Sequence, residues 1–232
     1  MNIEGSTGDN SAVYKGSAFN LHPSKLLNEL YQIRNYQGAN PENAKILFVS
    51  RDPNWHFDIE NIPVFEKVTE YLTGGISFWR KYGFHHPFLF SHYGGDEGRY
   101  HRMFSNLNLD SNLADKISFI ELIGFPTTGM AKNFDNVFKS HLLSEENRKH
   151  LIQLDKMLEA KDKIIFIAWG LLKDFTYIKT GLFKNLSNID RDQLDIKGLN
   201  QIDNIFIHKH FSDSISNATI AKISIEVNNY LK

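Results

Sequence analysis

The 232-residue sequence contains no cysteine. This absence excludes disulfide bonds, thiolate zinc sites, cysteine nucleophiles and iron–sulfur clusters held by cysteine. The sequence also lacks an apolar run near the roughly 18 residues that a membrane-spanning helix requires. Its first residues contain no basic segment followed by an apolar one, as a signal peptide would. We therefore expect a cytoplasmic protein without a membrane partner.

An excess of charge of one sign is absent as well. The chain has 26 basic and 27 acidic residues, for a formal net charge of -1. Avid non-specific binding of nucleic acid depends on a large basic surface, so a nucleic-acid partner would need a local patch. The best local basic patch is Arg99-Tyr100-His101-Arg102, which we interpret as a solvated helix face.

Several cofactor motifs are missing. The sequence has neither a Gly-x-x-x-x-Gly-Lys-Ser phosphate loop nor a Gly-x-Gly-x-x-Gly pattern after its first apolar run, which argues against nucleoside triphosphates and dinucleotides. Ten histidines are present, but they show no His-Glu-x-x-His or other fixed ligand spacing. We therefore expect no metal and no organic cofactor.

The remaining composition, 41% hydrophobic and 13% aromatic, is sufficient for one domain with a full core. Short, nearly continuous apolar runs are typical of strands buried on both faces of a parallel sheet. Four runs fit: Lys45–Ser50, Ile117–Ile123, Lys163–Trp169 and Asn204–His208.

Between these runs the apolar residues follow helical spacing. The pattern predicts helices over Ser24–Tyr36 and Asn61–Leu72, a helix capped by Ser144, and a last helix from about Asn217. Strands alternating with crossover helices predict a three-layer αβα fold around a central four-stranded parallel sheet. We expect a flexible N-terminal arm at residues 1–21 and a single domain at 22–232, with residues 73–99 as its least regular part.

Ligands of open parallel sheets bind beyond the carboxyl ends of the strands. The segments that follow the four runs are therefore the candidate site. They are Ser50-Arg51-Asp52-Pro53-Asn54-Trp55-His56, then Glu121 with Phe125–Gly129, then Trp169-Gly170, and finally His208-Lys209-His210-Phe211-Ser212.

In this order the motifs resemble those of the uracil-DNA glycosylase superfamily. The family has a Gly-x-Asp-Pro-like motif after its first strand, an Asn on the second, a Leu-Gly-like pair on the third and His-Pro-Ser after the fourth. Here Val49–Pro53, Phe119–Glu121, Ala168–Gly170 and His210–Ser212 occupy those places. The similarity covers residues 45–216, although each motif is short.

The resemblance implies roles for individual residues. Asp52 matches the family carboxylate that positions water and stabilises the oxocarbenium-like sugar. His210 matches the histidine that donates to the departing base, and Ser212 belongs to the same substrate-contacting motif. A flipped base is held between aromatic faces, for which Phe78 is the candidate, with Trp55 or Trp79 as alternates. Ile215 is the candidate wedge that fills the vacated stack.

Glu121 departs from the family, which has Asn at this place. An ionised carboxylate only accepts hydrogen bonds, so Glu121 either reads a base with an amino group, or is held neutral by burial and donates, or marks a lost uracil pocket. Arg51 either neutralises Asp52 or meets a phosphate. If these residues have no catalytic role, Asp52-Pro53 is an ordinary turn signal, and Glu121 and Arg51 form a structural ion pair.

The sequence therefore predicts a monomeric, monofunctional DNA N-glycosylase that hydrolyses the N-glycosidic bond of an altered base in single- or double-stranded DNA. The alternative is a catalytically inactive module with the same fold, which binds nucleic acid or a protein partner.

Overall fold

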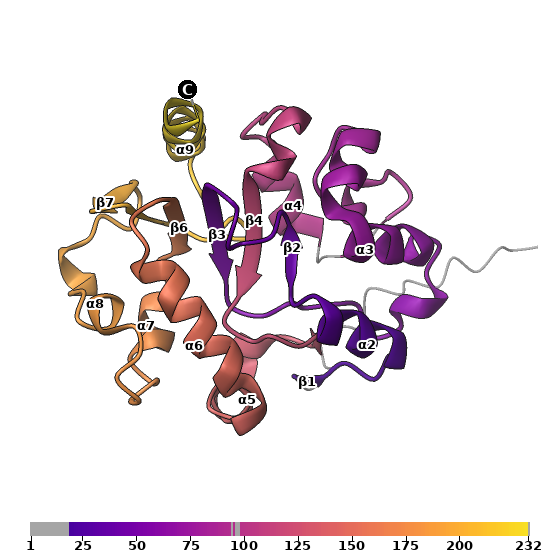
Figure 1. Ribbon diagram of the computed structural model, residues 1–232, viewed down its shortest axis with the longest axis horizontal. Coiled ribbons are helices and arrows are strands. Elements are labelled where there is room, and N and C mark those ends of the chain that lie inside the picture. Colours follow the sequence, from indigo (N-terminus) through magenta and orange to yellow (C-terminus); the bar gives the residue numbers. More distant parts are fainter. Residues whose placement is uncertain (1–18, 94, 96–97, 232) are drawn as a thin grey trace, which may run out of the picture.

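The computed structural model describes residues 19–93, 95 and 98–231. Within these ranges, helices cover both faces of a mixed six-stranded β-sheet (Figure 1). From one edge to the other, the strands are β2 (Tyr36–Gly38), β4 (Ile117–Glu121), β3 (Ile46–Ser50), β6 (Ile164–Ala168), β8 (Ile205–His208) and β7 (Asn200–Ile202).

The four central strands are parallel and coincide with the four predicted apolar runs. The prediction of a sheet with only four, parallel strands is wrong, because β2 and β7 add an antiparallel strand at each edge. Both edge strands have only three residues, Tyr-Gln-Gly and Asn-Gln-Ile. Such short, largely polar segments carry no periodic apolar signal.

The helices divide between the two faces of the sheet. Alternate strand residues supply two core clusters, so that Leu47 and Val49 face one layer of helices while Ile46 and Phe48 face the other. The first layer contains α5 (Asp135–Leu142), α6 (Glu145–Glu159), α7 (Leu171–Phe175) and α8 (Lys184–Ser187); the second contains α4 (Gly98–Ser105) and α9 (Asn217–Tyr230). A search of the described helices finds none with the length and apolar character needed to cross a membrane.

Serine residues form the N-caps of three helices, α2, α6 and α9. The hydroxyl oxygen of Ser24 accepts from the Leu27 amide at 3.1 Å at the start of α2 (Lys25–Ile33). Ser144 caps α6 as predicted, and Ser216 caps α9 through the amide of Thr219 at 3.1 Å. Each cap satisfies an amide that the first helical turn leaves without a partner.

Helix α3 (Phe65–Tyr82) differs most from its prediction. It begins four residues later than Asn61 and extends ten residues beyond Leu72, into the segment expected to be irregular. The helix continues past Gly74, where the backbone kinks (φ -148°, ψ 56°), because Phe78 and Trp79 are buried on its far half. Gly75 permits the contact with β2, since a Cβ there would lie 2.9 Å from the backbone nitrogen of Gly38.

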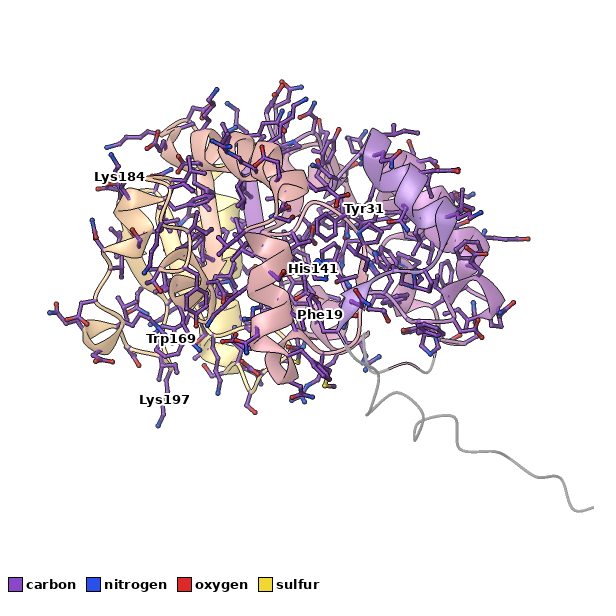
Figure 2. All side chains as sticks on the ribbon, turned by 90° about the horizontal axis from the view of Figure 1, so that it is seen from below. Phe19, Tyr31, His141, Trp169, Lys184 and Lys197 are labelled. Atoms are coloured by element: carbon purple, nitrogen blue, oxygen red, sulfur yellow. The ribbon has the colours of Figure 1, made fainter. Side chains whose placement is uncertain are left out.

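The segment before α2 belongs partly to the fold. Phe19 is 1% exposed, and its ring lies 5.9 Å from the ring of His141 (Figure 2). Strand β1 (Asn20–Leu21) pairs with β5 (Thr127–Thr128). The last three residues of the predicted arm therefore belong to the domain, Phe19 through burial and the exposed Asn20 and Leu21 through strand pairing, whereas residues 1–18 lie outside the described residues.

Candidate functional site

A row of stacked phenylalanine rings crosses the four parallel strands on the face covered by α4 and α9. Neighbouring ring centroids lie 4.8 to 5.7 Å apart and neighbouring planes differ by 13 to 24°. The row consists of Phe119, Phe48, Phe166 and Phe206. It forms an apolar layer directly below the carboxyl ends of the strands.

Side chains two positions further along a strand lie on the same face. Above Phe119 and Phe48, these positions are Glu121 and Ser50, which are direct partners in the β3–β4 ladder. Above Phe206 the position is His208, whose ring packs on Phe211 at 4.9 Å. The strand register therefore places a carboxyl group and a hydroxyl group next to each other on the aromatic layer.

Glu121 is buried with part of its carboxyl group unpaired. The residue is 6% exposed, and its Oε2 atom has no hydrogen-bond partner. Burial raises the pKa of Glu121 to about 8, and the nearby charge of Asp52 raises it further. At pH 7 the group is therefore largely a neutral acid, with one O–H donor and one C=O acceptor.

Asp52 lies in a loop that is clamped onto β5. The Thr127 amide donates to the Pro53 carbonyl at 3.0 Å, and the Trp55 amide donates to the Thr127 carbonyl at 2.9 Å. The Thr127 hydroxyl lies 3.1 Å from Oδ2 of Asp52. Burial raises the pKa of Asp52 to about 6, although this hydrogen bond and the charge of Arg51 oppose the rise. Asp52 is therefore mostly ionised at pH 7.

His210 has a defined tautomer. Its Nδ1 atom accepts from the Ser212 backbone amide at 3.2 Å and lies 2.6 Å from the Ser212 hydroxyl oxygen. A backbone amide can only donate, so the neutral ring carries its proton on Nε2. Burial lowers the pKa of His210, which keeps the ring neutral at pH 7. Ser212 thus makes Nε2 a hydrogen-bond donor.

Tyr100, on α4, joins these groups. Its ring centroid lies 5.2 Å from that of His210, and burial raises its pKa, to which the charge of Glu121 adds while the nearby Ser50 side chain opposes the rise. From the sequence, Tyr100 was expected on a solvated helix face. Arg99 is exposed there, but Tyr100 turns inward. The spacing of Tyr100, Phe104 and Leu107, which is i, i+4, i+7, was the available signal.

Trp55 lies in a buried polar network and has no face open to a base. It is 2% exposed and donates from Nε1 to the Tyr31 hydroxyl at 2.9 Å. The Tyr31 oxygen also accepts from Gln37 at 3.2 Å, and the Tyr71 hydroxyl donates to Gln37 at 2.7 Å. This network ties the segment after Asp52 to α2 and α3. Burial raises the pKa of Tyr31 and of Tyr71, and the charge of Glu121 adds to both rises.

Three further predicted contacts are buried in the core. Phe78 is 1% exposed and packs against the Tyr71 ring at 5.4 Å, so the expected stacking role does not fit it. The alternate Trp79 is 3% exposed. Ile215 is 6% exposed and packs in the cluster under α9, which is a core position and not the exposed loop position expected of a wedge. Sequence position alone did not distinguish these core side chains from loop tips.

Arg51 contacts neither Glu121 nor Asp52 directly. Its Nε and Nη2 atoms each lie 3.0 Å from an oxygen of Asp174, and Nη2 also lies 3.1 Å from Asp135. The guanidinium group stacks on the Phe138 ring at 3.8 Å. The predicted pairing of Arg51 with Glu121 is therefore wrong. Arg51 instead joins the β3 exit to α5 and α7.

Three histidines, His85, His86 and His101, form a stack in which His85 and His86 are buried. The rings of His86 and His101 are parallel within 5° at 3.4 Å, and Nε2 of His85 lies 3.1 Å from Nδ1 of His101. Burial lowers the pKa of all three. In the part of the chain that the structure describes, no group of three or more His, Asp or Glu side chains is arranged to hold a metal ion.

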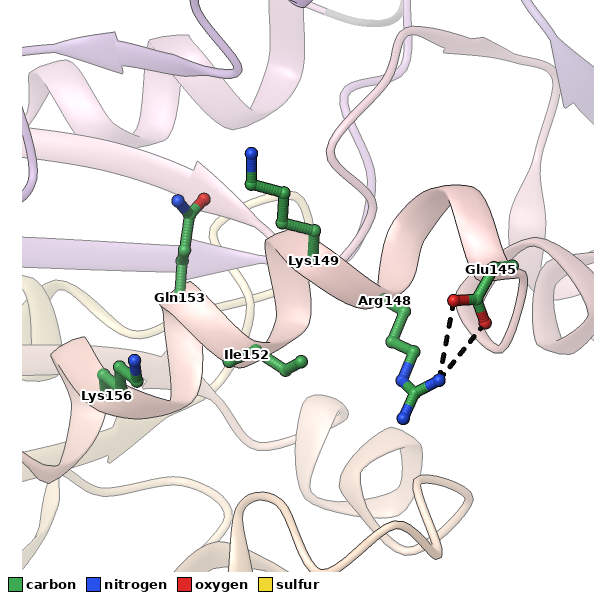
Figure 3. A pocket seen from close by; sticks show the side chains of 6 residues that line it. All are labelled: Glu145, Arg148, Lys149, Ile152, Gln153 and Lys156. Atoms are coloured by element: carbon green, nitrogen blue, oxygen red, sulfur yellow. Dashed lines mark hydrogen bonds and ion pairs between the residues drawn. The ribbon is translucent and has the colours of Figure 1, made fainter.

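A surface hollow of about 420 Å³ lies on α6 (Figure 3). Its side chains all come from this one helix, and Glu145 and Arg148 pair across it at 3.5 Å. Helix α6 covers the sheet face opposite to Tyr100 and α4. The hollow therefore contributes no residue to the group formed by Asp52, Glu121 and His210.

Comparisons with family models, curated proteins and solved structures find no match for this chain. The fold and the site define the class: an α/β protein with a mixed sheet between two helical layers, and with ionisable side chains gathered at the carboxyl ends of its parallel strands.

Proposed function

We propose that this protein is a monofunctional DNA N-glycosylase, which hydrolyses the bond between deoxyribose and an altered base. The observation that carries the proposal is the environment of the two carboxyl groups. Asp52 and Glu121 interact, yet their pKa values are separated, at about 6 and about 8. Such a separation gives one ionised and one neutral carboxyl group at pH 7, which is the pattern of acid–base sites.

The ionised group, Asp52, supplies the charge that the reaction needs at the sugar. As the base departs with the bonding electron pair, positive charge develops at C1′, and a buried carboxylate stabilises it. Water then adds its oxygen to C1′. One of its protons stays in the new C1′ hydroxyl group, and the other ends on the departed base, which leaves as the neutral free base. Thr127 holds the Asp52 carboxylate in a fixed orientation for this step.

The neutral histidine, His210, acts on the leaving group. Because Ser212 occupies Nδ1, the Nε2–H bond is free to donate to a carbonyl oxygen of the base, on which negative charge accumulates. A preorganised donor of this kind favours the transition state over the ground state.

Glu121, as a neutral carboxylic acid, recognises the base through hydrogen bonds. A carboxylic acid presents a donor next to an acceptor, as the carboxamide of Asn does, and so pairs with a carbonyl beside a ring N–H. The unpartnered Oε2 atom and the burial of the side chain support this choice among the alternatives for Glu121. An ionised Glu121 would instead favour bases that carry an amino group.

The test is single-turnover cleavage of single- and double-stranded oligonucleotides that carry uracil, hypoxanthine, xanthine or amino-bearing altered bases. We expect strand cleavage after hot alkali with wild-type protein, and a loss of about 100-fold or more in Asp52→Asn and in His210→Ala. The matched control is Asp58→Asn, which changes an exposed aspartate on the same loop. A folded wild type that cleaves no oligonucleotide of the panel would refute the proposal. Salt-sensitive DNA binding without cleavage would then favour the inactive binding module.

A further inference from the structure

We propose that Asn147 and His150, both on α6, are positioning residues that hold Glu121 in its buried position and thereby set which bases the site accepts. We call this pair the α6 clamp. The inference rests on the proposed glycosylase function and adds two residues that lie outside the four motifs of the resemblance. The clamp acts from the helical layer opposite to α4.

On one side, the backbone at the end of β4 extends past its neighbouring strand. Strand β2 begins at Tyr36, which pairs with Ile120, so Glu121 lies one residue beyond this ladder. His150 Nε2 lies 2.7 Å from the Glu121 carbonyl oxygen, at the place that a further strand residue would take. A carbonyl oxygen only accepts, so the neutral ring carries its proton on Nε2 and donates it. Its Nδ1 atom then accepts from the Asn35 side-chain amide at 2.9 Å.

Asn147 holds the residues that follow Glu121. Its Oδ1 atom accepts from the Gly124 amide at 2.9 Å, and its Nδ2 atom donates to the Leu122 carbonyl at 2.9 Å. Asn147 is 1% exposed and His150 is 6% exposed. Buried polar side chains are costly unless they are hydrogen-bonded. Both clamp residues spend such bonds on the backbone of residues 121–124.

The close approach of α6 to this backbone depends on a glycine. Asn147 and His150 are three residues apart on the helix, so they share one face. A Cβ atom at Gly124 would lie 2.7 Å from Cγ of His150, which is too close for two non-bonded carbon atoms. Gly124 therefore lets the helix lie against the β4 exit. Movement of the Glu121 backbone toward solvent would break the hydrogen bonds of the clamp.

The position of Glu121 decides which base it accepts. In its buried position the carboxyl group is largely neutral at pH 7 and pairs with a carbonyl beside a ring N–H. A Glu121 side chain released toward water ionises more readily, and an ionised carboxylate favours a base with an amino group. The clamp therefore favours uracil and hypoxanthine over cytosine and adenine, which carry amino groups.

The first measurement needs no DNA. His150→Leu and Asn147→Ala remove the clamp, whereas His150→Gln keeps an N–H donor near the place of Nε2. The matched control is Gln153→Leu, at an exposed polar residue one turn further along α6 (Figure 3). Carbon-13 NMR follows the titration of the Glu121 carboxyl group. We expect its midpoint to move to lower pH by about one pH unit or more in the two clamp-removing variants, and to stay near wild type in the other two.

The second measurement reports base selection separately from cleavage. Oligonucleotides with 2′-fluoroarabino nucleotides resist hydrolysis, so fluorescence anisotropy can report their affinity. The matched pairs are uracil with cytosine and hypoxanthine with adenine, which differ by a carbonyl against an amino group. We expect wild type to prefer the carbonyl member of at least one pair. His150→Leu and Asn147→Ala should lose roughly tenfold of this preference, because a hydrogen-bond pattern at a base edge is worth at least that much.

Thermal unfolding checks that each variant is folded, and Asn147→Ala supplies a second variant should His150→Leu prove unstable. An unchanged Glu121 titration or an unchanged base preference in folded clamp-removing variants would overturn the role of the clamp and leave the glycosylase proposal standing. If wild type neither cleaves nor discriminates any probe, the glycosylase proposal fails and base selection fails with it, while the NMR titration still decides whether α6 holds Glu121. Equal shifts in His150→Gln and His150→Leu would contradict a role for the donated hydrogen bond.

Discussion

The carboxyl groups of Asp52 and Glu121 interact across the exits of β3 and β4, and the charge of Asp52 helps to raise the pKa of Glu121. Both groups have folded-state pKa values above their ordinary ones, about 6 against 3.8 for Asp52 and about 8 against 4.5 for Glu121. A carboxyl group of this kind binds its proton more tightly in the folded state than in the unfolded state. Its contribution to stability is complete below about pH 4 and is lost as pH rises toward 8.

The first prediction concerns stability against pH. Relative to Glu121→Gln, which cannot ionise, wild type should lose free energy of unfolding between pH 5 and pH 9; the buried histidines, whose pKa values are lowered, titrate in both proteins and cancel in this difference. The difference at pH 9 should reach a few kcal/mol, because one pKa unit corresponds to about 1.4 kcal/mol. Urea unfolding at several pH values measures it, with the exposed Glu66→Gln as control. Parallel profiles for wild type and Glu121→Gln would contradict the raised pKa.

The second prediction concerns activity against pH. Excision requires ionised Asp52 and protonated Glu121, so the single-turnover rate at subsaturating protein should follow a bell with limbs near pH 6 and pH 8. The two limbs belong to the coupled pair. Glu121→Gln should keep the acidic limb and lose the basic one. A basic limb that persists in this variant would assign the upper titration to another group.

Much of the fold was predictable, because each central strand carries its own apolar run. Lys45–Ser50 is apolar throughout its middle, and this pattern suffices for a strand buried on both faces. Strands β2 and β7 were not predictable, since three residues such as Tyr-Gln-Gly become a strand only through pairing with a neighbour. The length of α3 was missed for a similar reason: burial of Phe78 and Trp79 outweighs the Gly74-Gly75 break.

The site was predictable only in part. The positions of Asp52, Glu121 and His210 follow from the rule that strand exits meet at one edge of a parallel sheet. The inward turn of Tyr100 and the neutral state of Glu121 depend on packing between segments distant in the chain. Burial also argues against the predicted wedge role of Ile215. Its neighbours Ser214 and Ser216 are exposed, so the burial of Ile215 could not be predicted from its place in the loop.

The third prediction tests the role of Arg51. Arg51→Gln should lower the free energy of unfolding by about 3 kcal/mol, because it leaves the Asp174 side chain, 3% exposed, without its bidentate partner. The double variant Arg51→Gln with Asp174→Asn should regain more than half of the loss. Urea denaturation measures both. Arg148→Gln, in an exposed pair with Glu145, should change stability by less than about 1 kcal/mol. A double variant no more stable than the single one would show that the pair is not the cause.

The last prediction separates a core residue from a DNA wedge. Ile215 is 6% exposed and packs beside Phe211 and Ile220, so Ile215→Ala should cost about 2 to 5 kcal/mol of stability through the cavity it leaves. Below its unfolding temperature, the variant should excise bases from single- and double-stranded DNA in the wild-type ratio. A wedge acts only where a stack must be filled, so its loss would slow duplex excision alone. Leu143→Ala, at a residue 51% exposed, is the control for both measurements. A selective loss on duplex DNA would restore Ile215 to the DNA interface and require the loop after His210 to open on binding.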